Sequence, residues 1–139
     1  MHQSTSNMLT RPEIRCEKYH AILAVTDVRA AVDFYTTRLG FWLAFVEGDP
    51  PNFAGVNLGS VQLFLESGTP SPQGCAAYFV VDDADKLHHF QETSGVEILE
   101  KLGDRPYGLR DYTVRDDSGY RLTFDHHLQH CAAHTDLNR

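Results

Sequence analysis

The feature that most constrains how this chain can fold is an internal repeat. Asp27 and Asp83 are 56 residues apart, as are Phe34 and Phe90, and each pair occupies equivalent places in the two halves. Around each pair the residue pattern predicts the same order of elements: a strand, an acidic helix cap, a helix and three further strands. The sequence therefore predicts a duplicated folding unit of the type βαβββ.

In the first half, the apolar run His20–Val25 predicts a strand, and Asp27 is a favourable N-cap for the helix that follows it. The helix is predicted over residues 28–39, and Gly40 is suited to end it. Its apolar face is expected to consist of Val28, Ala31, Val32, Tyr35 and Leu39. Three further strands are predicted at residues 41–46, 53–58 and 61–65.

The second half repeats this order. The run Ala76–Val81 predicts a strand, Asp83 repeats the cap, and a helix is predicted from about residue 84 to residue 93, with Leu87 and Phe90 inward and Gly95 as its stop. Three more strands are predicted near residues 96–101, 109–114 and 120–124.

Two such units predict an α+β fold in which two βαβββ modules form a curved mixed sheet around a cleft, with the helices on the outside. The expected modules are residues 18–66 and 75–126, joined by a Pro-, Gly- and Ser-rich linker at 67–74. Residues 1–17 are expected to be a disordered or extended lead-in, and 127–139 a C-terminal tail. The modules can meet within one chain or across two chains. Because one unit leaves an exposed edge and a half-built cleft, we expect a homodimer.

Charge and composition exclude several classes of function. The net charge of -7 offers nothing to neutralise a phosphate backbone, so we expect no nucleic-acid partner. The sequence has neither an apolar run long enough for a bilayer nor a secretory signal, so we expect no membrane partner and a cytoplasmic location. The three cysteines, Cys16, Cys75 and Cys131, are odd in number and widely spaced, which indicates reduced thiols. Neither a nucleophile elbow nor a glycine-rich phosphate loop is present.

Two polar features are given structural interpretations. The acidic pairs Asp82-Asp83 and Asp116-Asp117 fall at a cap and at a turn, where structure accounts for them without catalysis. In the tail, His126, His130 and His134 would stack on one side of a helix and bind zinc or nickel; the interpretation that we favour is a terminal extension without a folded role.

Three segments carry a resemblance to a known family. Residues 20–41 contain a His-led strand, Val-Thr-Asp, a helix with Phe34-Tyr35 and a closing Leu-Gly-Phe. Residues 106–112 read Pro-Tyr-Gly-Leu-Arg-Asp-Tyr, and residues 115–124 read Arg-Asp-Asp-Ser-Gly-Tyr-Arg-Leu-Thr-Phe. In this order the segments resemble the glyoxalase / bleomycin resistance protein / dioxygenase superfamily, also called vicinal oxygen chelate, and its bleomycin-resistance-like branch. The resemblance covers residues 20–126 and implies the fold, which hosts unrelated chemistries.

The resemblance also implies where a metal would lie. Enzymes of this superfamily usually hold one divalent metal with four inward side chains, which correspond here to His20, Gln62, Ala76 and Thr123. Only His20 is a good ligand, because Gln62 and Thr123 are weak donors and Ala76 has none. The sequence therefore predicts no metal and no other cofactor. The alternative is a divalent metal held by His20 with Gln62, Glu66 and waters.

Strand alternation predicts which side chains line the cleft. If Leu63, Leu65, Leu122 and Phe124 pack under the helices, their neighbours in each strand face the cleft. The loop residue Tyr107 is positioned to close over a ligand, and Asp111 supplies a charge. The predicted ligand-binding residues are His20, Trp42, Phe53, Gln62, Phe64, Tyr78, Tyr107, Asp111, Arg121 and Thr123. Two plainer readings stay open: the aromatic rings simply fill the face, and His20 is a satisfied hydrogen-bonding residue.

The leading functional hypothesis is a metal-independent small-molecule binding protein that sequesters a planar or cationic antibiotic-type ligand, as the resemblance implies for bleomycin-resistance-like members. The second hypothesis is an enzyme, either a metal-dependent glyoxalase-like lyase or isomerase, or an extradiol-type dioxygenase. A third is an interaction domain whose cleft is filled by its own side chains. No catalytic residues are predicted.

Overall fold

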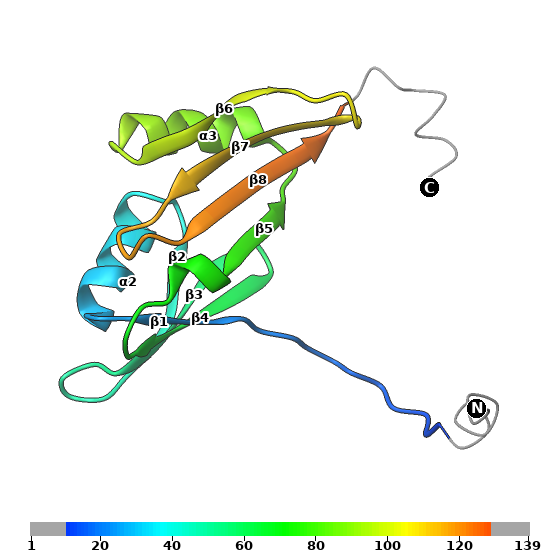
Figure 1. Cartoon of the computed structure of the whole chain (residues 1–139). Helices are drawn as coiled ribbons and strands as arrows, with labels where there is room; N and C mark the ends of the chain where they lie inside the picture. The colour runs from blue at the N-terminus through cyan, green and yellow to red at the C-terminus, as the bar shows by residue number, and fades with distance from the viewer. Residues whose placement is uncertain (1–10, 129–139) are drawn as a thin grey trace.

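The computed structural model describes residues 11–128 and contains two modules of the predicted type (Figure 1). The first module comprises β1 (Ile22–Val25), α2 (Val28–Thr37), β2 (Trp42–Glu47), β3 (Phe53–Leu58) and β4 (Val61–Ser67). A short 3-10 turn (Pro72–Gly74) lies in the linker. The second module comprises β5 (Ala76–Val80), α3 (Ala84–Thr93), β6 (Glu97–Asp104), β7 (Leu109–Arg115) and β8 (Arg121–His127). The predicted α+β class of two βαβββ modules is confirmed.

The strands form two four-stranded mixed sheets of identical topology. Their orders are β1-β4-β3-β2 and β5-β8-β7-β6, with β1 parallel to β4, β5 parallel to β8 and all other pairs antiparallel. Among the described residues no strand pairing joins the two sheets, so each module has a sheet of its own. In Figure 1 the first sheet lies below the second, and the chain before Tyr19 runs away from the folded body. Neither helix of residues 11–128 is long and apolar enough to cross a membrane.

The helix signals predicted from the sequence are present in both modules. Asp27 accepts a hydrogen bond from the backbone N–H of Ala30 at 3.1 Å, and Asp83 accepts one from the N–H of Lys86 at 3.0 Å. Gly40 follows α2 with a φ of 88°, a conformation that favours glycine. The acidic residue at position 83 is therefore a cap, as expected.

The last strand extends further than predicted. His126 lies in β8, where it pairs with Arg110 of β7. His126 therefore cannot belong to the helical histidine stack that was the less favoured alternative, because the ladder with β7 holds this residue in extended conformation. His130 and His134 lie outside the described residues.

In each module α2 or α3 covers one side of the sheet, and these two covered sides pack together in one shared core. Hydrogen bonds between the modules are buried in this core. The hydroxyl of Tyr35 on α2 donates to Asp116 after β7 at 2.6 Å, and the hydroxyl of Tyr120 donates to the carbonyl of Ala24 at 2.8 Å. The rings of Phe41 and Phe79 meet edge to face, with centroids 5.6 Å apart. The modules of one chain are therefore joined through the sides that carry the helices.

One core prediction is wrong. Phe90 of α3 is 45% exposed, whereas its neighbour Gln91 is completely buried. The Gln91 amide donates to the carbonyl of Leu39 at 2.8 Å and accepts from the hydroxyl of Tyr112 at 2.8 Å. Because both ends of the amide are hydrogen-bonded, a polar residue occupies the inward position of α3 at little cost. Gln91 lies 56 residues after Tyr35, so the repeat places a polar connector at the same point of both helices.

Candidate functional site

Each sheet has one side covered by its helix and one open side. In the first sheet the alternate residues Leu23, Leu63 and Leu65 are buried on the helix side. Their neighbours Ile22, Gln62 and Phe64 therefore project from the open side. We call this open side of the first sheet the aromatic face, defined by Trp42, Phe45, Phe53 and Phe64 with His20 and Gln62.

Three phenylalanine rings form the centre of the aromatic face. The ring centroids of Phe45, Phe53 and Phe64 lie 5.1 to 5.9 Å from one another. His20 packs on Phe64 at 4.5 Å, and its Nδ1 lies 3.0 Å from the carbonyl oxygen of Gln62. Trp42 is 54% exposed at the edge of the cluster. The structure therefore brings together five of the predicted site residues: His20, Trp42, Phe53, Gln62 and Phe64.

Phe45 is a member of this face that sequence reasoning missed. Strict alternation from Trp42 puts residues 44 and 46 on the open side, but the register of β2 against β3 shifts between Leu43 and Phe45. Phe45 then lies opposite Gly55, where a Cβ atom would overlap its ring. A glycine in the middle of a predicted strand was the available signal, since it marks a close approach of another group.

The open side of the second sheet has a different chemical character. We call it the polar face, defined by Tyr78, Asp111, Thr113, Arg121, Thr123 and Asp125. The hydroxyls of Thr113 and Thr123 are 2.8 Å apart, and Arg121 pairs with Glu100 at 3.2 Å. The loop residue Tyr107 reaches this face by donating its hydroxyl to Asp111 at 2.9 Å. Four further predicted residues and Tyr107 thus lie together on the second module.

The two carboxylates of the polar face differ in their partners. Asp111 is 5% exposed and binds the guanidinium of Arg105 at 2.6 Å, in addition to Tyr107. The hydrogen bond to Asp111 raises the pKa of Tyr107 and that of Arg105. Asp125 is 1% exposed, and among the described residues neither carboxylate oxygen has a partner in hydrogen-bonding geometry. Burial first, and then an interaction between its hydroxyl and Asp125, raise the pKa of Tyr78 to about 12, so the Tyr78 hydroxyl lies near this carboxylate although not in good hydrogen-bonding geometry.

Sequence reasoning missed both Arg105 and Asp125. The last strand was predicted to end at Phe124, so the alternation through Arg121 and Thr123 was not carried one step further. In the structure β8 continues to His127, and Asp125 lies opposite Asp111 of β7.

The four positions that would hold a metal in related enzymes do not fit one. Ala76 has no donor atom, and the Thr123 hydroxyl is engaged with Thr113. Gln62 lies on β4 of the other sheet, and His20, just before β1, contacts its carbonyl oxygen; together they offer one good ligand, whereas a stable site needs three or more converging donors. This donor set disagrees with the metal chemistry of the superfamily.

Another cluster of ligand-type atoms lies at the start of α3. One ligand atom each of Asp83, Asp85 and His126 fall within 4.8 Å of one another, the one such group in residues 11–128. All three already have structural partners. Asp83 caps the helix, Asp85 pairs with Arg110 at 2.9 Å, and His126 Nδ1 accepts from the N–H of Ala84 at 2.7 Å. We therefore interpret this cluster as part of the fold.

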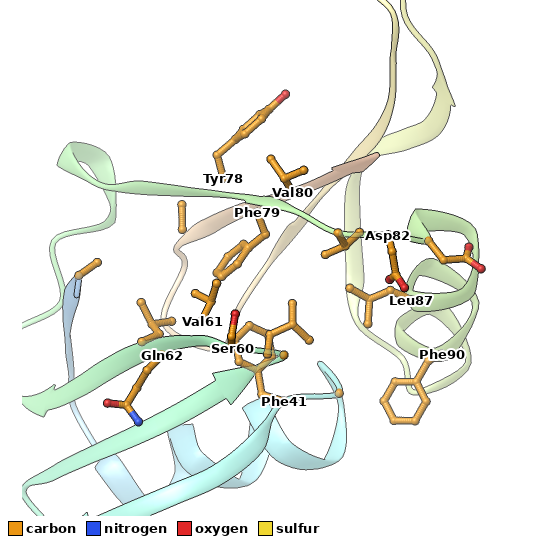
Figure 2. A pocket seen from close by; sticks show the side chains of 18 of the residues that line it. Phe41, Ser60, Val61, Gln62, Tyr78, Phe79, Val80, Asp82, Leu87 and Phe90 are labelled. Carbon is orange, nitrogen blue, oxygen red and sulfur yellow. The ribbon is translucent and has the colours of Figure 1, made fainter. Parts of the chain in front are cut away.

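A groove of about 1160 Å³ separates β5 and α3 from the turn between β3 and β4. Figure 2 shows Phe79 and Val61 pointing into it, whereas Tyr78 and Val80 project from the other side of β5. Among the described residues, no hydrogen bond, ion pair or ring contact joins the aromatic face to the polar face. One chain thus presents two separate surfaces, one suited to stacking and one suited to charge.

Two βαβββ modules with one uncovered face on each sheet define a class of protein. Comparison of the sequence with known protein families gives the family. The family model "Glyoxalase/Bleomycin resistance protein/Dioxygenase superfamily" matches residues 19–124. The chain belongs to this superfamily. No curated protein matches the sequence.

Several solved structures have a similar fold. TioX from Micromonospora sp. ML1 is 26% identical, with a TM-score of 0.71 over 81% of this chain and 100% of that one. The bleomycin-binding protein of bleomycin-producing Streptomyces verticillus, solved with copper(II)-bleomycin, is 27% identical, with a TM-score of 0.64 over 81% and 97% of the two chains. A glyoxalase/bleomycin resistance protein/dioxygenase from Nocardioides, 20% identical with a TM-score of 0.68 over 91% and 93%, shows the fold alone.

Proposed function

We propose that the protein binds and sequesters a planar, cationic small molecule of the antibiotic type, without a metal of its own. The aromatic face carries this proposal. Three phenylalanine rings pack together on the uncovered side of a sheet, and Trp42, on the same side, is more than half exposed. Aromatic groups gathered on a surface that no helix or strand of residues 11–128 covers are typical of a binding site for a flat ligand.

Two other observations support it. The four positions that hold the metal in related enzymes offer one good ligand here, which argues against chemistry that depends on a Lewis acid at that place. A similar structure is that of a bleomycin-binding protein in complex with copper(II)-bleomycin. Bleomycin is therefore the first ligand to test.

We also propose that the binding site is completed by a second copy of the chain. The helix sides are already used in contacts within the chain, and the two open faces do not meet there. In a homodimer, the polar face of one copy can lie over the aromatic face of the other and enclose a shared ligand.

Fluorescence of Trp42 tests the binding function, because Trp42 is the single tryptophan of the chain. We expect its emission to change with saturation as bleomycin is added. Phe64→Leu should weaken binding about two- to tenfold, since one aromatic contact contributes about 0.5–1.5 kcal/mol. Phe34→Leu, which removes a ring of α2 from the other side of the sheet, is the matched control. Emission that does not respond to bleomycin or to related aromatic antibiotics would refute the proposal.

Size-exclusion chromatography with light scattering tests the assembly. We expect a mass of twice the 15.7 kDa of the chain at micromolar concentration. A monomer under these conditions would rule out a site shared between two copies, and binding by the aromatic face of a single chain would then have to account for any affinity.

A further inference from the structure

The polar face contains a pair of carboxylates with unequal partners. Asp111 and Asp125 lie directly opposite each other on the antiparallel strands β7 and β8, so their side chains project from the same side of the sheet. Both are almost completely removed from solvent. We call them the carboxylate pair.

Only one negative charge of the pair is compensated. Arg105 and Tyr107 bind Asp111, whereas neither oxygen of Asp125 accepts a hydrogen bond of good geometry from the described residues, and the group that lies near it is the neutral Tyr78 hydroxyl. A buried carboxylate without a partner is strongly unfavourable, and a folded protein normally provides a donor for it.

The nearby cations are committed elsewhere. The three arginines of β7 and β8 pair with four other acidic residues: Arg110 with Asp85 and Asp104, Arg115 with Glu97, and Arg121 with Glu100. Asp125 is therefore left as an acceptor for a group that comes from outside the described chain.

We propose that the carboxylate pair is the subsite that binds the cationic group of the ligand, an organic ammonium or guanidinium. This inference rests on the proposed function and names the chemistry that the polar face adds to it. The rings of Tyr78 and Tyr107, which are 58% and 64% exposed, flank the subsite and provide faces for a cation. Tyr78 lies on the edge strand β5 beside Asp125, so its ring can turn aside without disturbing the core, and the ligand's cation takes its place.

The same geometry argues against a divalent metal at this place. A metal needs several free oxygen or nitrogen donors, and the Asp111 carboxylate is held by a guanidinium that would repel it. An ammonium needs only the free oxygens of Asp125 and an aromatic wall. The subsite therefore matches a monovalent organic cation.

The experiment compares two probes that differ only in charge: 2-naphthylmethylamine and 2-naphthalenemethanol. Isothermal titration of the full-length protein should show the amine binding at least about tenfold more tightly than the alcohol, as expected for a hydrogen bond to a charged group. In Asp125→Asn this preference should disappear while the alcohol binds as before. Asp33→Asn, which changes the net charge equally on the exposed side of α2, should keep the preference.

The possible outcomes separate this inference from the proposed function. If both probes bind equally to the wild-type protein and bleomycin still changes Trp42 emission, the cation subsite is refuted and the binding function stands. If neither probe nor bleomycin binds, both are refuted. The thermal midpoint of Asp125→Asn is a second measurement. If Asp125 is kept for a ligand, the substitution should not lower the midpoint. An Asp125→Asn protein that unfolds would show that Asp125 has a structural role instead.

Discussion

The hydrogen bond between Tyr35 and Asp116 should be a main link between the two modules, and Tyr35→Phe removes it without creating a cavity. The Tyr35 side chain is completely buried, and its hydroxyl lies 2.6 Å from the carboxylate of Asp116. Burial first, and then the Asp116 charge, raise the pKa of Tyr35 well above its ordinary value, so the hydroxyl keeps its proton and acts as a donor.

The structure sets the size of the effect. A hydrogen bond to a charged group contributes about 1.5–3 kcal/mol to stability. Asp116 keeps two backbone donors after the substitution, the N–H groups of Ser118 at 2.9 Å and Tyr120 at 2.8 Å. We therefore expect the lower part of this range, about 1.5–2 kcal/mol of lost unfolding free energy. For a chain of this size that corresponds to a thermal midpoint lower by about 6–8 °C.

Urea and thermal denaturation followed by circular dichroism measure this loss. Tyr19→Phe, at a tyrosine exposed to solvent, is the control and should leave the midpoint unchanged. A double-mutant cycle with Asp116→Asn isolates the pair. A loss below about 0.5 kcal/mol in Tyr35→Phe, or a coupling energy near zero, would refute the view that this bond joins the modules.

Three further predictions follow from single contacts. Gly55→Ala should lower the urea midpoint by the equivalent of about 1–3 kcal/mol, because the new methyl group would enter the space of the Phe45 ring; an unchanged midpoint would contradict the bulge geometry of β2. Burial first, then Asp116, raise the pKa of Asp117 to about 6, above 3.8 in the unfolded chain, so native stability should fall as pH rises from 3.8 to about 6. Because Asp117 is exposed to solvent, we expect this fall in stability to be small, and Asp117→Asn should remove it. Equal pH profiles of the urea midpoints of the wild-type protein and Asp117→Asn would contradict this prediction. Elemental analysis of protein purified without chelator should find no stoichiometric metal, and a metal that is lost in His20→Ala would favour the enzyme hypothesis instead.

The sequence was sufficient to predict the fold because the repeat and the alternation depend on local chemistry. Asp27 and Asp83 cap the helices, and β3 and α3 begin and end at the predicted residues. The helix-side core, for example Leu63 and Leu65, was predicted because burial there depends on apolarity alone. The sequence did not show that each module keeps its own sheet, because that arrangement depends on how two finished modules pack.

Three features of the site and the core could not be predicted from the sequence, and the reason can be identified for each. Phe45 reaches the aromatic face through a bulge, and one extra residue inverts the alternation on which the prediction relied. Gln91 is buried because its amide finds two partners from distant parts of the chain, which no local pattern shows. Asp125 was missed because the apolar pattern ends before β8 does, and a charged residue near a predicted strand end is normally exposed.

The comparison of the two modules explains why the open faces carry the functional information. On the helix side the parallel strand pairs are apolar in both modules: Leu23 opposite Leu65 in the first, and Phe79 opposite Phe124 in the second. On the open side the equivalent pairs differ at one step and agree in charge at the next. Phe64 beside Ile22 corresponds to Thr123 beside Tyr78, whereas Glu66 beside Ala24 corresponds to Asp125 beside Val80. Packing against a helix demands apolar groups wherever it occurs, whereas an uncovered face is limited only by what it contacts. The two modules are therefore uniform on the packed side and differ on the open side mainly where Phe64 is replaced by Thr123. Under the proposed function, the aromatic face would take the flat body of the ligand and the polar face its cationic group, and a second copy of the chain would bring the two faces together.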